Sequence, residues 1–217
     1  MIKISNVETW GFEHAIRGMR NPLNSWDKSD SYKNFTVDYD GDAEIHHPYY
    51  RVGAADLALM KRLYQGGSEH RKYLRQIMVS FDITAPLYWW KEFDTYKVGT
   101  VANSCSTMHK IHAKEFELDD FSYEHLIPGY YGTGVLKTVI DSLNVFRENY
   151  LETKDKKYWW QMIQLLPTSY NQKRTITMNY ENVITIIKQR SGHKLDEWHT
   201  LIDAFKKLPY VEEIMGD

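Results

Sequence analysis

The sequence predicts a helix-rich α+β fold in a single domain that spans residues 1–217. Segments with apolar residues three or four positions apart, typical of helices, alternate with segments in which every second residue is apolar, typical of strands. With 42% hydrophobic and 14% aromatic residues, the chain can bury a substantial core. No internal repeat or low-complexity linker divides the chain, so one domain is expected.

A strand and two helices are expected first. Residues 1–10, MIKISNVETW, alternate in polarity and predict a strand. Residues 13–35 predict a short helix that leads into a polar loop. Residues 53–67 carry Met60 and Leu63 on one face and end in two glycines, which predicts a second helix.

The clearest strand signal lies at residues 72–84, where apolar and polar side chains alternate. Directly after it, residues 85–96 predict a helix, with Pro86 in its first turn. The apolar side chains of the strand are Ile77, Val79, Phe81 and Ile83.

The second half of the chain is expected to be mainly helical. Residues 113–131 are acidic, rich in tyrosine and irregular, and a long helix then reaches about Thr153. Residues 173–179 predict a short strand or an extended loop. Two helices follow, at residues 180–190 and 194–207.

Composition excludes several classes of function. Lys and Arg total 27 against 29 for Asp and Glu, so no general attraction to a nucleic acid polymer is expected. No apolar run approaches the roughly 20 residues that span a membrane, and the first residues lack the uncharged core of a signal peptide. A lone Cys105 cannot form an internal disulfide, which fits a cytoplasmic protein.

Arg190 occupies an unusual position in the predicted helix 180–190. It lies seven residues after Val183, at the end of an apolar stripe where another aliphatic side chain is expected. One interpretation is structural: the stem packs and the guanidinium reaches solvent or a carboxylate. The other is functional: the side chain enters a cleft and holds an anion or a polarised carbonyl.

Hydroxyl side chains and cations are concentrated behind an aromatic block, in the stretch DTYKVGTVANSCSTMHK at residues 94–110. Ser104, Ser106 and Thr107, with backbone amides, could wrap a phosphate as an amide nest, and Lys110 would add positive charge. We therefore interpret this segment as a ligand loop. The alternative is a surface turn followed by a solvated basic face.

Three other features have a functional and a structural interpretation. Cys105 is a candidate nucleophile, but a lone cysteine is more often a buried packing residue. Arg17 and Arg20, with Asn24, form either an anion clamp or part of an exposed loop. The histidine pairs of the chain lack a third ligand in sequence, so no metal site is predicted.

Two segments, DITAPLYWWKEFDTYKVGTVANSCSTMHK and LLPTSYNQKRTITMNYENVITIIKQRSGHKLDEW, follow each other in a distinctive order. Together they resemble the central and C-terminal segments of the flavin-dependent thymidylate synthases, the ThyX family. The resemblance covers roughly residues 56–205 and implies a ThyX-like α+β fold, helix-rich with a central, mostly antiparallel sheet. Matching positions in this sequence are Ala85-Pro86, Leu166-Pro167, Asn179, Arg190 and His70.

The family's signature motif, R-H-R-x-x-S-x-N-E-x-S-x-R-Y, is largely replaced here. Several of its arginines are lost, and Glu181 and Ile163 stand where the family carries two further arginines. Arginine binds phosphate through a planar pair of donors, so these losses weaken the phosphate sites that the family uses. The replacements in the motif are Thr95, Tyr96 and Lys97 for R-H-R, Thr100 for the first serine, Ala102 and Asn103 for N-E, Cys105 for the second serine, and Thr107 and Met108 for R-Y.

The resemblance implies a set of site residues. Family reactions move a one-carbon unit to a deoxyuridine nucleotide with reduced FAD as hydride donor, in a homotetramer whose sites are built from several subunits. Arg190 is the residue expected to be catalytic. Those expected at FAD are His70, Tyr96, Lys97 and Asn179, and those expected at the substrate are Glu92, Asn103, Ser104, Cys105, Ser106, Thr107 and Arg190.

Two hypotheses of function follow. The first is a divergent thymidylate synthase-like methyltransferase that uses FAD and a pyrimidine nucleotide. The second is a protein on the same scaffold that binds or sequesters a nucleotide without catalysis. Retention of Arg190, Asn179 and His70 favours ligand binding, whereas replacement of the signature disfavours the family reaction.

Overall fold

A computed structural model describes residues 2–40 and 43–216 of the chain. The described residues form two compact units. Unit 1 comprises those within 1–6, 81–176 and 193–201, and unit 2 those within 7–80, 177–192 and 202–217. The fold class is α+β, as predicted, with helices and a four-stranded sheet.

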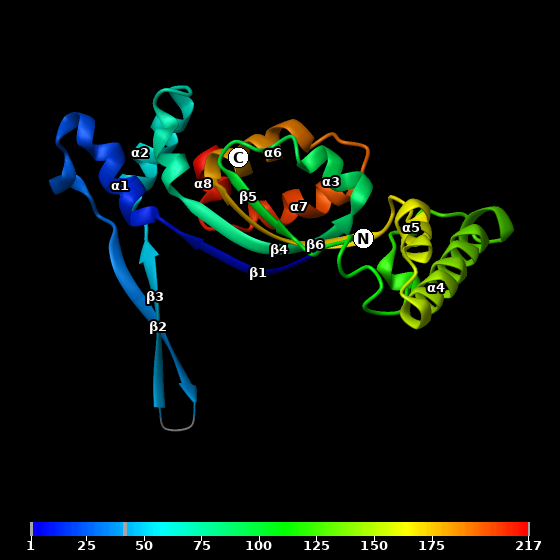
Figure 1. Ribbon diagram of the computed structural model, residues 1–217. Coiled ribbons are helices and arrows are strands. Elements are labelled where there is room, and N and C mark those ends of the chain that lie inside the picture. The colour runs from blue at the N-terminus through cyan, green and yellow to red at the C-terminus, as the bar shows by residue number, and fades with distance from the viewer. Residues whose placement is uncertain (1, 41–42, 217) are drawn as a thin grey trace. The chain divides into compact units, whose positions relative to one another are not determined.

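The elements of the first half alternate between strands and helices (Figure 1). They are β1 (Lys3–Trp10), α1 (Phe12–Arg20), the short 3-10 turns η1 (Asn21–Leu23) and η2 (Trp26–Lys28), β2 (Tyr32–Asp40), β3 (Ala43–Arg51), α2 (Ala54–Gln65), the 3-10 segment η3 (Arg71–Gln76), β4 (Met78–Pro86), α3 (Leu87–Phe93) and β5 (Thr100–Ser104).

Helices dominate the second half. They are the 3-10 turn η4 (Leu118–Asp120), the π-helical turn η5 (Tyr130–Gly134), α4 (Val135–Thr153), α5 (Lys156–Leu165), then β6 (Asn171–Asn179), α6 (Tyr180–Arg190), α7 (Asp196–Lys206) and α8 (Val211–Met215). In the described part of the chain, no helix is both long enough and apolar enough to span a bilayer.

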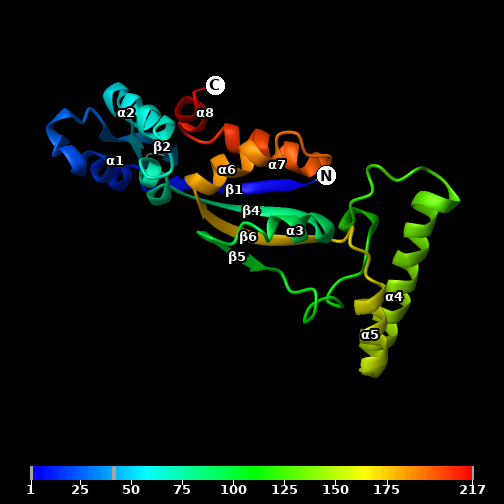
Figure 2. The ribbon, with the colours of Figure 1, turned by 90° about the horizontal axis from the view of Figure 1, so that it is seen from above.

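The main sheet has the strand order β1-β4-β6-β5, so β1 and β5 are its edge strands (Figure 2). Along β4, every second side chain is buried, which is the pattern of a strand with one face against a core. The other two strands, β2 and β3, pair with each other as an antiparallel hairpin in which Phe35 faces Pro48.

Unit 1 has an aromatic core beside α3. Trp89, Trp90 and Phe93 of this helix are buried, and Trp89 and Phe93 pack against Trp198 of α7. The helix begins after Pro86, whose side chain has no hydrogen-bonding group to cap it. Carbonyl groups of the segment before β6 replace the cap: Leu87 N–H donates to Tyr170 O at 3.0 Å and Tyr88 N–H to Thr168 O at 2.9 Å.

A second core of unit 1 lies where α4 and α5 run side by side (Figures 1 and 2). The connection between them is two residues long, with Lys154 in the left-handed conformation at φ 55°, and so short a connection makes neighbouring helices antiparallel. Asp155 caps α5 by accepting a hydrogen bond from Lys157 N at 2.9 Å.

A buried ion pair ties the first loop of unit 2 to α2. Arg20 Nε lies 2.6 Å from Asp56 Oδ1, and both side chains are almost fully buried. Burial raises the pKa of Asp56, but the hydrogen bonds from Ser29, Ser31 and Arg20 outweigh it, so the pKa of Asp56 lies below its ordinary value. The guanidinium also donates to the carbonyls of Ser25 and Lys28.

Several predicted boundaries are corrected. The strand expected at 72–84 begins at Met78, because residues 71–76 form the 3-10 segment η3. The helix expected at 85–96 is confined to α3, because Pro86 still has an extended backbone. The sequence reading did not identify β2, β3, β5, α5 or α8.

Candidate functional site

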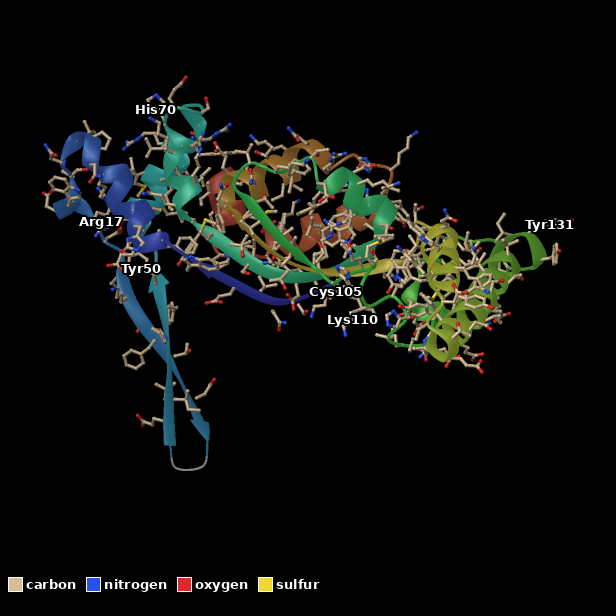
Figure 3. The ribbon with its side chains drawn as sticks, in the orientation of Figure 1. Arg17, Tyr50, His70, Cys105, Lys110 and Tyr131 are labelled. Atoms are coloured by element: carbon tan, nitrogen blue, oxygen red, sulfur yellow. The ribbon has the colours of Figure 1, made fainter. Side chains whose placement is uncertain are left out.

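His70 lies at a large cavity within unit 2. The cavity has a volume of about 1060 Å³ and is lined by α1, the loop after it, α2 and η3. Figure 3 labels His70 at the turn between α2 and η3, where its side chain is exposed. The cavity wall combines apolar side chains with cations, and these residues are Met19, Pro22, Leu23, Leu59, Leu63, Lys28, Arg62 and Lys72.

The cavity has an excess of positive charge. Lys28, Arg62 and Lys72 line it together with one carboxylate, Glu69. Apolar walls with a few charged groups are typical of sites for small organic ligands. The sequence reading found His70 here, but the three cations carry no motif that would have identified them.

Arg20 also lines this cavity, yet it is a structural residue. The predicted anion clamp requires its guanidinium to be available, whereas that group binds Asp56 and two backbone carbonyls. Arg17 is exposed, with its Nη2 3.2 Å from His14 Nδ1, and does not line the cavity. The clamp interpretation is therefore wrong for Arg20.

Glu181, which replaces a family arginine, is bound by two arginines of η3 in unit 2. Arg75 donates to it from Nε, and Arg71 Nε lies 3.5 Å from Glu181 Oε1. The hydrogen bond to Glu181 raises the pKa of Arg75. Sequence reasoning missed both arginines, because the partners are about a hundred positions apart along the chain.

Asn179 and Arg190 begin and end α6. Asn179 is the N-cap: its side-chain oxygen accepts a hydrogen bond from Asn182 N at 3.0 Å. Val183, Ile186 and Ile187 are buried, which confirms the apolar stripe, and Arg190 at its end is half-buried. Asn179 thus has a structural role, and its predicted contact with a flavin stays a prediction.

In unit 1, Glu92 lies in a polar cluster on α3. His193 Nε2 is 3.0 Å from Glu92 Oε2, and Trp198 Nε1 donates to the same oxygen at 3.3 Å. The ring of Tyr96 packs edge-on against Trp198, with centroids 5.9 Å apart. The structure thus brings Glu92 and Tyr96 to the same indole, whereas Lys97 is exposed.

The predicted ligand loop begins as a strand. Asn103 and Ser104 belong to β5, an edge strand, and their side chains are exposed. An edge strand presents one row of backbone groups and its side chains to solvent, which leaves these two residues accessible. Thr107, two residues beyond Cys105, is half-buried.

Three backbone amides of the predicted ligand loop form hydrogen bonds within the chain, and the amide-nest interpretation stays a prediction. Cys105 N donates to Lys173 O at 2.9 Å, and Ser106 Oγ accepts from Met108 N and His109 N at 3.2 and 2.9 Å. These three amides are therefore engaged within the chain. Ser106 acts as a turn-forming residue, as serine commonly does.

Cys105 is exposed, so the packing interpretation of this residue is wrong. Figure 3 labels it with Lys110, on the segment that follows β5. Among the side chains that the structure describes, no group of three His, Cys, Asp or Glu residues has the geometry of a metal site. The side chains of His46 and His47 lie outside that description.

Comparisons with known proteins bear on the fold. No protein-family model matches the sequence, and a search of curated proteins found no relative. Among solved structures, thymidylate synthase X (ThyX) of Helicobacter pylori, crystallised with FAD and dUMP, matches 99% of this chain and 97% of its own at 18% identity and a TM-score of 0.67. A second structure of that enzyme with FAD and dUMP matches with a TM-score of 0.65, also at 18% identity, covering 97% of each chain.

The chain has the ThyX fold. A third match, the UMP/dUMP methylase PolB of Streptomyces cacaoi bound with 5-Br dUMP, covers 100% of this chain and 94% of its own at 13% identity and a TM-score of 0.58. The predicted ThyX-like fold with its central antiparallel sheet is therefore confirmed. Sequence identities of 13–18% establish the fold alone, so the activity of this chain has to be inferred from its own residues.

Proposed function

We propose that the chain is a divergent flavin-dependent thymidylate synthase-like protein that binds a pyrimidine nucleotide and FAD. In this proposal, it transfers a one-carbon unit to a deoxyuridine nucleotide. The observation that carries the proposal is the cavity of about 1060 Å³ beside His70, in a chain with the ThyX fold. The H. pylori enzyme of this fold was crystallised with FAD and dUMP, and PolB with 5-Br dUMP.

The cavity fits FAD in size and in chemistry. Ligand pockets of about 300–1000 Å³ are usual for organic cofactors. Apolar groups such as Leu59 and Leu63 suit an aromatic ring system, and Lys28, Arg62 and Lys72 suit a pyrophosphate. These residues and His70 would hold the cofactor, with Asn179 as a further proposed contact. Tyr96 and Lys97 of unit 1 stay proposed FAD contacts because the family resemblance implies sites built from several subunits.

Reduced FAD would supply the hydride, and the chain's own residues bind and orient the reactants. Arg190 is the proposed substrate contact on α6, because a half-buried guanidinium can bind a pyrimidine carbonyl through two parallel donors. In unit 1, we propose Glu92 as a hydrogen-bonding partner for the base. Residues of β5 and of the segment after it complete the proposed set: Asn103, Ser104, Cys105 and Ser106, whose side chains are exposed, and Thr107, which is half-buried.

The proposal includes a single functional domain, a homotetramer and a cytoplasmic location. The tetramer follows from the family resemblance, in which sites are shared between subunits. The cytoplasmic location follows from the exposed free Cys105, which suits a reducing compartment.

A second candidate is a nucleotide-binding protein without catalysis. The observation that favours it is the reversed charge at Glu181, which Arg71 and Arg75 bind within unit 2. A position that carries an arginine in the family thus holds the acidic partner of an internal ion-pair cluster. Ligand binding can persist after such a change while the geometry needed for the reaction is lost.

The nucleotide site is tested by calorimetric titration of uridine and thymidine nucleotides against Arg190 variants. Arg190→Ala is expected to lower nucleotide affinity about thirtyfold to a hundredfold, roughly 2 to 3 kcal/mol, with the melting temperature kept. Arg190→Lys should recover only part of the loss, because a point charge cannot replace the planar fork. Arg51→Ala, an exposed arginine of β3, is the matched control. Unchanged affinity with a lowered melting temperature would make Arg190 a structural residue.

The two candidates are separated by flavin binding and by product formation. Purified protein should be yellow and bind FAD, and His70→Ala should weaken FAD binding while the exposed His14→Ala does not. Formation of a thymidine nucleotide from reduced FAD, methylene-tetrahydrofolate and deoxyuridine monophosphate would establish the enzyme. Tight nucleotide binding without product would establish the second candidate.

A further inference from the structure

A second, smaller cavity lies within unit 2, where α2, η3 and α6 meet. Its volume is about 280 Å³, far more than the roughly 30 Å³ that one water molecule takes up in the liquid. Leu74 and Ile184 provide apolar wall, and the rest of the lining is polar. The polar residues are Tyr64, Arg71, Glu181, Thr185, Lys188 and Gln189.

Tyr64 lines this cavity, and its buried hydroxyl has no hydrogen-bond partner among the residues that the structure describes. Tyr64 is 6% exposed, and its Oη forms no hydrogen bond with any residue that the structure describes. A buried hydroxyl without a partner costs free energy, so native proteins nearly always pair it. Arg71 Nε is likewise buried without a hydrogen bond, because Glu181 lies 3.5 Å away as an ion-pair partner only.

Two cations lie close to the ring that carries this hydroxyl. Lys188 Nζ lies 4.8 Å from the centroid of the Tyr64 ring, and the Arg71 guanidinium carbon lies 5.9 Å from it. The two side chains come from different elements, α6 and η3, and both line the cavity. Two elements thus bring positive charge to the same buried phenol.

The charge of Glu181 is already matched at this cavity. Arg75 binds its carboxylate through Nε, with Nη2 at 3.4 Å, from the exposed side of η3. Because Arg75 neutralises the charge of Glu181, the positive charges of Arg71 and Lys188 give the cavity a net positive charge. A guanidinium has five N–H donors and an ammonium three, so both can bind an acceptor in the cavity beside the phenol.

We propose that Tyr64, Arg71 and Lys188 form a binding site for a small oxyanion of the phosphate class, either free or at the end of a small molecule. Phosphate oxygens accept hydrogen bonds from hydroxyl, guanidinium and ammonium donors, so one oxyanion satisfies the Tyr64 hydroxyl and both cations together. This oxyanion site shares no lining residue with the cavity beside His70, so phosphate binding here does not require the flavin or the pyrimidine nucleotide.

The test is calorimetric titration with inorganic phosphate, at ionic strength held constant with chloride, on the full chain. Wild type should bind phosphate. Tyr64→Phe, which removes only the hydroxyl, and Lys188→Gln should each weaken binding by about tenfold or more. Lys194→Gln, an exposed lysine outside the cavity, should bind as wild type does. A parallel titration with glycerol 3-phosphate distinguishes the sources: tighter binding of the ester indicates a carried phosphate group, and equal or weaker binding indicates the free ion.

Melting curves in chloride alone separate this site from a structural role of Tyr64. Tyr64→Phe keeps the ring near the two cations and removes a buried unpaired group, so its melting temperature without phosphate should equal or exceed that of wild type. A lower melting temperature with unchanged phosphate affinity would overturn the proposal. Phosphate binding no stronger than that of chloride would overturn it as well.

Discussion

Arg20 illustrates how one arginine is committed to the fold. It is the last residue of α1, and it binds Asp56, which is 0% exposed. Removing one partner of a buried ion pair leaves the other charge buried without compensation. Four further hydrogen bonds converge on the same pair, from Arg20 to the carbonyls of Ser25 and Lys28 and from the hydroxyls of Ser29 and Ser31 to Asp56.

Arg20→Ala should therefore lower the free energy of unfolding by about 3 to 5 kcal/mol. Urea denaturation followed by circular dichroism measures it. Arg17→Ala, an exposed arginine one turn earlier on α1, is the control and should change stability by about 0.5 kcal/mol or less. Equal stability of the two variants would show that the buried pair contributes nothing.

Arg20 and Arg190 also show what sequence could predict at this scale. Each ends a helix, but the partner of Arg20 lies 36 positions away, so the sequence alone could not separate a structural arginine from a ligand-binding one. The apolar stripe before Arg190 was visible because it is local. The exposure of Cys105 was not predictable, because it is not local: Cys105 follows an edge strand, and which strand lies at the edge depends on the order of strands in the sheet.

At the scale of elements, α6 depends on its N-cap. Asn179 accepts a hydrogen bond from Asn182 N, which satisfies one of the backbone donors at the start of the helix. Asn179→Ala should lower the free energy of unfolding by about 1 kcal/mol, whereas Asn179→Ser, another good cap, should keep most of it. Thermal melts of the two variants check this. If the Asn179→Ala variant is as stable as wild type, the N-cap hydrogen bond of Asn179 does not contribute to the stability of the fold.

Asp82 of β4 makes the stability of the fold depend on pH. Hydrogen bonds from Lys173, first, and from Thr175 and Asn6 lower the pKa of Asp82 to about 2, against about 3.9 in an unfolded chain. The lowered pKa means that this stabilisation is complete above about pH 4 and is lost as the pH falls through about 2.

The stability difference between wild type and Asp82→Asn should therefore shrink across that window. Denaturant unfolding at a series of pH values measures the difference. Asp119→Asn, which changes an exposed carboxylate, serves as the control and should show no comparable trend. A difference that stays constant from pH 5 to about pH 2 would mean that Asp82 does not titrate as its contacts imply.

Elements with a strong local period were predictable, and those that depend on distant partners were not. The alternation of β4 and the stripe of α6 were visible in the sequence. By contrast, the hairpin of β2 and β3 has polar and aromatic residues without a core-facing alternation, since large side chains such as Phe35 and Ile45 are exposed. For the candidate site, the family resemblance singled out His70, which lines the large cavity, and its contact with a flavin stays a prediction. The pairing of Glu181 with Arg71 and Arg75 was not predictable, because it joins η3 to α6.

At the scale of the whole molecule, the β2–β3 hairpin leaves large apolar side chains exposed. Phe35 and Ile45 on the hairpin are 53% and 42% exposed, and the hairpin is a separate two-stranded sheet. The register places them on opposite faces, since Phe35 pairs with Pro48 and Ile45 with Asp38. An isolated two-stranded hairpin is marginally stable in water, so contact with another subunit would stabilise it.

We therefore expect a homotetramer in solution, as the family resemblance implies. Light scattering coupled to size-exclusion chromatography should give four times the mass of the 217-residue chain at micromolar concentration. The double variant Phe35→Thr and Ile45→Thr keeps strand propensity but removes apolar surface from both faces, so it should shift the protein to smaller species without loss of far-ultraviolet dichroism. Lys33→Thr, a polar position on the same hairpin, should leave the tetramer intact. A wild-type monomer would contradict the prediction, because subunit-shared sites of the kind that the family resemblance implies cannot form from one chain.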